Sequence, residues 1–359
     1  MRDETADLTG IVPEATGDLT GIVPEAPLAE PPQTPTVEPV YAPLTEPPQE
    51  RTQDESPAFA PVPQEQSFIE RLRIRWQSGR TLLCIGLDGE MGRLPYSVRA
   101  GQTSMLALDE EREGSHVEGA LVTFNQAIID ATADLVCAFK PNVAFYEIYG
   151  PAGLRALMRT IAYIHARYPD VPVILDAKRG DVSSTSRAYA VAAFETCDAD
   201  AVTLQPYLGR DALAPFLEHA DRGSFILCRT SNPGAGEMQD LVVAMEGHEE
   251  PLYVALARRV ANDWNALGNC GLVVGATYPE ELRRVREAAP DLPILVPGIG
   301  AQGGDLAGTI RAGLDSQGQG LIVSASRSVL YSSTGPDFAN AARHEALRLW
   351  KEIDQLRQG

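Results

Sequence analysis

Apolar and polar residues follow two different periodicities along most of this chain. Short, nearly continuous apolar runs are typical of strands buried on both faces of a parallel sheet. The eight runs of this kind are Leu82–Leu87, Leu135–Phe139, Val171–Leu175, Ala201–Leu204, Phe225–Cys228, Leu272–Val274, Ile294–Val296 and Leu321–Val323. Longer segments with apolar residues at every third or fourth position predict helices. These helices are expected over Leu121–Thr132, Gly153–Arg167, Thr185–Thr196, Ala212–His219, Leu252–Leu267, Glu280–Ala288, Asp305–Ala312 and Phe338–Leu356.

The order of these elements predicts the fold class. Eight strands, each followed by a helix over about 290 residues, predict an α/β protein with a closed (β/α)₈ TIM barrel. A doubly wound open sheet is the alternative, but it usually has fewer strands. One further helix is expected before the first strand, with Ser67 as its cap and Phe68, Leu72 and Trp76 on its apolar face.

Residues 1–65 differ from the rest of the chain. They are rich in Pro, Glu and Thr, and their thirteen acidic and two basic residues account for more than half of the net charge of −19. A nine-residue segment, Asp7–Ala15, recurs as Asp18–Ala26, and two copies are too few for a solenoid. We expect a disordered tail before a barrel domain at 66–359. The repeat is interpreted as a duplicated linker, with a partner-docking motif as the alternative.

Composition excludes several classes of function. The strong negative charge argues against nucleic acid or an anionic membrane as a partner. No apolar run approaches the length of a membrane span, and the N-terminus lacks a signal-peptide pattern. The five cysteines form no C-x-x-C pair, which suits reduced thiols in the cytoplasm. Scattered histidines and the absence of dinucleotide or Walker motifs predict no metal and no cofactor.

Charged residues follow the second and third strands. Side chains alternate along a strand, so Asp176 and Lys178 are expected to face the same way, roughly 7 Å apart. Gly180 allows the chain to turn before Asp181, and Lys140 ends the preceding strand. Because the carboxyl ends of barrel strands share one face, these groups are expected to form one charged set. Such a set can bind an anion and deliver a proton, although a salt-bridged strand end is the simpler interpretation.

A phosphate site is predicted beside this charged set. The glycine-rich stretch 297–304 follows the seventh strand and leads into a helix near Asp305, where backbone N–H groups favour an anion. Loops after strands seven and eight are the usual phosphate site of this barrel. Arg327 offers a bidentate donor and Gln302 a neutral one. The alternatives are turn-forming glycines and a surface arginine. The long connection 89–118 is expected to cover the mouth of the barrel.

Four segments together carry a family resemblance. Phe139–Glu147, Asp176–Asp181, Pro297–Gln302 and Ser326-Arg327 resemble orotidine 5′-phosphate decarboxylase of the longer bacterial type. The likeness extends from about residue 67 to the C-terminus. The first two motifs are specific in combination and in order, whereas other phosphate-binding barrels share the glycine loop.

The resemblance implies decarboxylation of orotidine 5′-monophosphate (OMP) to UMP and CO₂ in pyrimidine biosynthesis, by a homodimer without metal or cofactor. Asp88 and Lys140 would contact the ribose hydroxyls. Asp176 would face the substrate carboxylate, and Lys178 would protonate C6 of the pyrimidine. Asp181 would reach the active site of the neighbouring subunit.

The remaining implied contacts lie further from the reacting carbon. Thr185 would also serve the neighbouring site, and Ser231 would contact the pyrimidine edge. The groups implied for the 5′-phosphate are the side chains of Gln302 and Arg327 and the backbone of Gly300 and Gly303. One local departure is Gly89-Glu90, where the family often has Pro-Asp, so the path of the following loop is open.

Two other functions fit parts of this pattern. A phosphosugar barrel, such as a 3-keto-hexulose-phosphate decarboxylase or aldolase, shares the D-x-K-x-x-D strand but needs Mg²⁺ and a further acidic ligand. The segment Phe139–Asn142 argues against it. A nucleotide-binding barrel without catalysis, whose tail recruits partners, is the second alternative, and the complete charged set argues against that.

Overall fold

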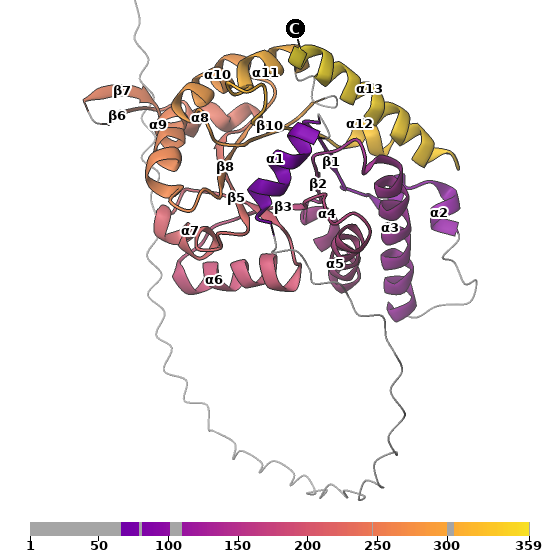
Figure 1. Ribbon diagram of the computed structural model, residues 1–359. Helices are drawn as coiled ribbons and strands as arrows, with labels where there is room; N and C mark the ends of the chain where they lie inside the picture. The colour runs from indigo at the N-terminus through magenta and orange to yellow at the C-terminus, as the bar shows by residue number, and fades with distance from the viewer. Residues whose placement is uncertain (1–65, 79–80, 101–109, 246, 300–304, 359) are drawn as a thin grey trace, which may run out of the picture. The chain divides into compact units, whose positions relative to one another are not determined.

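The computed structural model describes residues 66–78, 81–100, 110–245, 247–299 and 305–358, and the predicted tail lies outside them. Eight parallel strands form one sheet in the order β2-β1-β10-β9-β8-β5-β4-β3 (Figure 1). These strands are β1 (Leu83–Gly86), β2 (Ala138–Lys140), β3 (Ile174–Arg179), β4 (Ala201–Leu204), β5 (Gly223–Arg229), β8 (Cys270–Val274), β9 (Ile294–Pro297) and β10 (Leu321–Ala325). Two parallel bridges, Phe139 to Val173 and Asn142 to Asp176, join β2 to β3 and close the barrel. The predicted (β/α)₈ barrel is therefore confirmed.

Each of the eight predicted helices is present. The α-helices are α1 (Phe68–Ser78), α2 (Tyr96–Ala100), α3 (Glu110–Thr132), α4 (Ala144–Glu147), α5 (Gly150–Arg167), α6 (Ser183–Val191), α7 (Arg210–Leu217), α8 (Gly236–Gln239), α9 (Leu252–Arg259), α10 (Pro279–Ala288), α11 (Leu306–Gly313), α12 (Arg327–Leu330) and α13 (Phe338–Gln358). Short π-helical segments at 192–196 and 260–264 continue α6 and α9, so both predicted helices reach nearly their expected ends. No helix in these described segments combines the length and the apolar character needed to cross a membrane.

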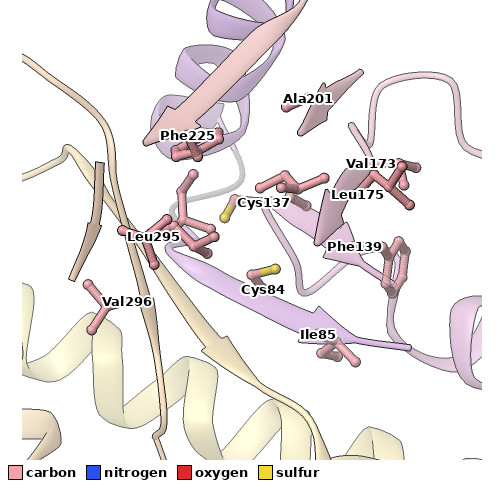
Figure 2. Close-up of a cluster of buried hydrophobic side chains, with 14 of the residues drawn as sticks. Cys84, Ile85, Cys137, Phe139, Val173, Leu175, Ala201, Phe225, Leu295 and Val296 are labelled. Carbon is pink, nitrogen blue, oxygen red and sulfur yellow. The ribbon is translucent and has the colours of Figure 1, made fainter. Parts of the chain in front are cut away.

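The barrel core is built from the predicted apolar runs. Figure 2 shows Leu175, Phe225 and Leu295, which come from three different strands, in one cluster of buried side chains. Parallel strands covered by helices are buried on both faces, which explains why these runs are continuous rather than alternating. At the N-terminal end of β5, the ring of Phe68 in α1 packs edge-to-face on Phe225, with ring centroids 5.7 Å apart.

The expected cap of α1 is also present. The Ser67 backbone N–H donates to Glu70 Oε2 at 2.9 Å, and the Glu70 N–H donates to Ser67 Oγ at 3.3 Å. This reciprocal pair is a capping box, which satisfies two backbone donors at the start of the helix.

Two features of the fold were not predicted. An antiparallel hairpin, β6 (Val242–Met245) and β7 (His248–Pro251), projects from the barrel after β5 (Figure 1). The sequence predicted no strand between Cys228 and the helix expected from Leu252. Val242 is 66% exposed, so the hairpin carries no buried apolar run that would reveal it. Strand β3 continues to Arg179, four residues beyond the predicted end at Leu175. Asp176 stays in the strand because it bonds to Lys140 of β2 and Thr203 of β4, as described below.

The long connection after β1 is partly helical. A 3₁₀ turn at Met91–Arg93 and α2 come first, and α3 begins at Glu110, well before the predicted start at Leu121. The centre of this connection, residues 101–109, lies outside the described residues. Its predicted position over the mouth of the barrel therefore stays a prediction.

Candidate active site

The carboxyl ends of the parallel strands carry most of the predicted site residues. Because all eight strands run in the same direction around the barrel, these ends share one face. In chain order the predicted residues at this face are Asp88 after β1, Lys140 in β2, Asp176 and Lys178 in β3, Ser231 after β5 and Arg327 after β10. The structure thus brings together residues that lie up to 239 positions apart in the sequence.

Three charged side chains form a continuous network at this face. Lys140 Nζ lies 2.9 Å from Asp176 Oδ2, and Lys178 Nζ lies 2.7 Å from Asp176 Oδ1. The side chains of Lys140 and Asp176 are only 5% and 11% exposed, whereas that of Lys178 is 49% exposed. One ammonium group is therefore buried, and the other is accessible to a molecule that enters the site.

Burial and charge act in opposite directions on this network. Burial would lower the pKa of Lys140, but the carboxylates of Asp176 and Asp88 outweigh it and raise that pKa above its ordinary value. Burial would raise the pKa of Asp176, but Lys140 and Lys178 outweigh it and hold that pKa well below its usual range. Both Lys140 and Asp176 are therefore ionised at neutral pH.

Asp176 and Lys178 meet for a reason that differs from the predicted strand alternation. The register between β3 and β4 shifts between Leu175 and Arg179, and Lys178 has a φ of +50°, in the left-handed region. This irregular backbone, and not the alternation of a regular strand, directs the Lys178 side chain toward Asp176. The hydroxyl of Thr203 in β4 also donates to Asp176 Oδ1 at 3.0 Å.

Two neighbours of the network were missed by the sequence analysis. Asn142 Nδ2 contacts Asp176 Oδ2 at 3.4 Å, and its backbone N–H donates to Asp88 Oδ1 at 3.0 Å. Asn142 belongs to the recognised motif after Lys140, so its position next to a charged residue was an available signal. For Thr203 the only signal was a single polar residue within the apolar run of β4.

Tyrosine hydroxyls define the path of the chain after β1. Tyr146 donates to Leu87 O at 2.7 Å, and Tyr149 accepts the Met91 N–H at 2.9 Å. Tyr331 donates to Asp88 O at 3.1 Å and accepts the Glu90 N–H at 2.9 Å. These bonds fix the backbone on both sides of Asp88. The departure from Pro-Asp therefore leads to a loop that is held by side chains from α4, from the residue before α5 and from the segment after α12.

The carboxylate of Asp181, in the turn after β3, bonds to its own backbone and not to this network. The Asp181 carboxylate accepts the Val182 backbone N–H at 2.7 Å, and among the described residues no ion pair joins it to a lysine. Thr185 lies in the first turn of α6, where its N–H donates to Val182 O at 2.9 Å. Val182 between them is 59% exposed. Within one chain, therefore, Asp181 and Thr185 do not complete the charged set.

The predicted contacts for the pyrimidine and the phosphate are placed only in part. Ser231 is half-buried beside Gly275, which follows β8. Arg327 is exposed at the start of α12. The described end of the glycine loop is regular, because the Asp305 side chain caps α11 by accepting the Gly308 N–H at 2.8 Å. The remaining predicted residues, Gly300, Gln302 and Gly303, lie outside the described residues.

The arrangement supports proton transfer and electrostatic stabilisation. Asp176 is a buried carboxylate fixed from both sides, and Lys178 is an accessible ammonium group in contact with it. Fixed charges of this kind act on a reacting group without the reorganisation that water requires. In the described part of the chain, no group of three or more His, Cys, Asp or Glu side chains is placed to bind a metal ion.

Comparisons of this chain with known proteins all identify the same family. The family model described as "Orotidine 5′-phosphate decarboxylase / HUMPS family" matches residues 82–342. The orotidine 5′-phosphate decarboxylase of Ralstonia pickettii is 48% identical over 293 residues, which cover 81% of this chain and 99% of the relative. That of Thermomicrobium roseum is 52% identical over 293 residues, covering 81% and 96%. The structure of Leishmania donovani OMP decarboxylase superposes with a TM-score of 0.66 at 37% identity, covering 82% of this chain and 100% of that one.

Proposed function

Since this chain belongs to the orotidine 5′-phosphate decarboxylase / HUMPS family, we propose that it converts OMP to UMP and CO₂ in pyrimidine biosynthesis. The observation that carries this proposal is the Lys140–Asp176–Lys178 network at the carboxyl ends of β2 and β3. It supplies an accessible proton donor, which protonates the carbon left by CO₂, next to a fixed negative charge, which can disfavour the bound carboxylate.

Lys178 is the proposed proton donor. When the bond between C6 and the carboxylate carbon breaks, its electron pair stays on C6 and CO₂ leaves. The Lys178 ammonium stabilises this developing negative charge and then transfers a proton from Nζ to C6, which gives UMP. The neutral amine recovers its proton from water. The half-exposed side chain of Lys178 supports this role, because it is accessible to a molecule that enters the site.

Asp176 is proposed to face the substrate carboxylate. Its pKa is held low by both lysines, so it keeps its negative charge at neutral pH. Two carboxylates held close together in a dry site repel each other, and this repulsion is relieved as CO₂ leaves. Lys140 and Asp88 are proposed to contact the ribose hydroxyls. They lie on the neighbouring strand and loop, where the Asn142 N–H orients Asp88.

Binding of the 5′-phosphate, far from C6, is proposed to lower the activation barrier of the reaction. Arg327, together with Gln302 and the backbone of Gly300 and Gly303, would bind the 5′-phosphate, and Ser231 would contact the pyrimidine edge. Binding energy from a remote phosphate can be used to position and desolvate the reacting group. The exposed position of Arg327 at the barrel face supports this assignment.

We also propose a homodimer in the cytoplasm. Asp181 and Thr185 would complete the site of the neighbouring subunit, because among the described residues of their own chain neither side chain is bonded to the network. The five cysteines are free thiols in this structure, which suits a reducing compartment.

The first experiment is the loss of OMP absorbance after addition of the purified protein, with EDTA present. Rapid conversion to UMP in EDTA supports the proposal and excludes a Mg²⁺-dependent phosphosugar reaction. A folded protein that binds UMP but converts no OMP would contradict the proposal. In that case a screen of phosphosugars with added Mg²⁺ would follow.

A further inference from the structure

One buried hydroxyl, that of Thr203 in β4, contacts three successive residues of β3. Thr203 is 1% exposed. Its hydroxyl donates to Asp176 Oδ1 at 3.0 Å and accepts the backbone N–H groups of Ala177 and Lys178, each at 3.0 Å. A hydroxyl has one proton and two lone pairs. The whole hydrogen-bonding capacity of Thr203 is therefore used by this segment of β3.

Strand β3 needs such a partner because its pairing with β4 is interrupted here. Leu175 lies opposite Val202 and Arg179 opposite Leu204, so β3 advances four residues while β4 advances two. The extra residues of β3 are out of register with β4, so the Ala177 and Lys178 N–H groups lack the β4 carbonyl partners of a continuous ladder. The Thr203 hydroxyl accepts both N–H groups instead. Such an acceptor is needed because a buried N–H group without one is unfavourable.

The same interruption gives Lys178 its unusual backbone. A φ of +50° is uncommon for a residue with a Cβ atom, and strain of this kind persists only where the surroundings stabilise it. The bond from the Lys178 N–H to Thr203 is one such stabilising contact. Because the Lys178 side chain is 49% exposed, packing restrains it less than a buried side chain. The position of its ammonium group therefore depends strongly on its backbone and on Asp176.

Thr203 also fixes the orientation of the Asp176 carboxylate. Oδ1 accepts from Thr203 and Lys178, while Oδ2 accepts from Lys140. Without the hydroxyl, Oδ1 keeps only the flexible and accessible Lys178 as its partner. Both the ammonium group and the carboxylate proposed to act at C6 are then less well positioned.

We infer that Thr203 is a positioning residue for the decarboxylation, acting through the backbone of Lys178 and the carboxylate of Asp176. This inference rests on the proposed role of Lys178 as proton donor. A misplacement of about 1 Å at a reacting group can cost about a hundredfold in rate. The effect is therefore expected in kcat rather than in the binding of the distant phosphate.

The test compares Thr203→Val, which keeps the shape and removes the hydroxyl, with Thr203→Ser, which keeps the hydroxyl. We expect Thr203→Val to lower kcat by about a hundredfold, with KM for OMP and Kd for UMP changed less than about threefold. Thr203→Ser should stay within about tenfold of the unsubstituted enzyme. Thr203→Cys, with a weakly bonding thiol, should be intermediate and replaces Thr203→Val if that variant does not fold.

Thr81→Val is the matched control. Thr81 is fully buried, and its hydroxyl donates to Leu135 O at 2.6 Å and accepts the Leu83 N–H at 3.2 Å. It lies before β1, at the end of the strand away from the candidate site. Removal of the Thr81 hydroxyl should lower the stability of the fold and leave kcat unchanged. The inference is wrong if Thr203→Val keeps kcat within about threefold of the unsubstituted enzyme, or if Thr203→Ser loses as much as Thr203→Val.

Combination with Lys178→Ala separates this inference from the proposed function. If Thr203 acts through Lys178, Thr203→Val should slow the Lys178→Ala variant far less than it slows the unsubstituted enzyme. Equal slowing in both backgrounds would overturn the action of Thr203 through Lys178. Where Lys178→Ala shows no measurable rate, the single variants decide. Near-normal turnover of Lys178→Ala would instead contradict the proposed function. A slow Lys178→Ala with a normal Thr203→Val would contradict only the role of Thr203.

Discussion

At the scale of single residues, Lys178 is the group whose replacement tests the mechanism most directly. Lys178→Ala removes both the cation next to the developing charge and the proton donor. We expect a folded protein that has lost about three or more orders of magnitude in kcat, measured by steady-state OMP turnover. Lys351→Ala, at an exposed position on α13, is the control and should have normal activity. Near-normal turnover of Lys178→Ala would require another proton donor.

A second residue-scale prediction concerns stability rather than catalysis. His165 contacts Asp200 at 2.9 Å through Nε2 and Asp198 at 3.2 Å through Nδ1, at the N-terminal end of the barrel strands. Burial would lower the pKa of His165, but these two carboxylates outweigh it and raise that pKa above its ordinary value. Folding therefore favours the protonated imidazole. Its contribution to stability is complete below pH of about 6.5 and is lost as the pH rises through the raised value.

We expect the free energy of unfolding to decrease between pH 6 and pH 8, and His165→Gln to reduce that decrease. Urea unfolding of both proteins at the two pH values measures it. The Asp200 carboxylate, which also pairs with Arg71, is ionised throughout this range and does not add to the slope. An unchanged pH dependence in His165→Gln would show that another group is responsible.

At the scale of elements, the sequence predicts the strands well because each one is buried on both faces. The run Ala201–Leu204 is the clearest case, since the predicted and observed bounds of β4 agree. The bounds of β3 could not be predicted, because the strand continues through Asp176 only where Lys140 and Thr203 offer partners from other strands. Such partners are set by the closed barrel and not by local sequence.

In the candidate site, too, the sequence predicted some features, whereas others depend on contacts between strands. The motif that begins at the end of β2 and the motif in β3 identified Lys140, Asp176 and Lys178, and the structure brings them into contact. The left-handed backbone of Lys178 could not be predicted, because lysine has no preference for it. The supporting contact from Thr203 depends on the register between β3 and β4, which the sequence does not display.

A contact between two loops leads to a further prediction at this scale. A Cβ atom at Gly275, after β8, would lie 2.6 Å from Ser231 Cβ and 2.8 Å from Ser231 N. Gly275→Ala should therefore displace the loop after β5. If Ser231 contacts the pyrimidine, KM for OMP should rise by about tenfold or more while the barrel stays folded.

Gly114→Ala is the control for that substitution. Among the described residues, its Cβ would contact the Ala152 Cβ at 3.6 Å, an ordinary distance for packing between α3 and α5. Kinetic constants of this variant should be unchanged. An unchanged KM in Gly275→Ala as well would remove Ser231 from the proposed set of substrate contacts.

At the scale of the whole molecule, the described part of one chain does not join all the proposed site residues in one bonded network. The barrel domain accounts for nearly the full length of its relatives, since 81% of this chain covers 99% of the Ralstonia pickettii protein. Within it, the Asp181 carboxylate turns to its own backbone and not to the lysine network. A second copy of the chain that supplies Asp181 and Thr185 is therefore the simplest way to complete the site.

Mixing two inactive variants tests this arrangement. In the proposed dimer, Lys140→Ala would remove a group from the chain's own site, whereas Asp181→Asn would remove a group from the neighbouring site. A hybrid dimer of the two then has one site with both changes and one site with neither. After random exchange half of the dimers are hybrids, so about a quarter of the unsubstituted activity per subunit should return. The control pair, Lys140→Ala with Lys178→Ala, should regain none, because both groups belong to the same chain's site. If mass spectrometry shows hybrid dimers and no activity returns, Asp181 does not act across the interface.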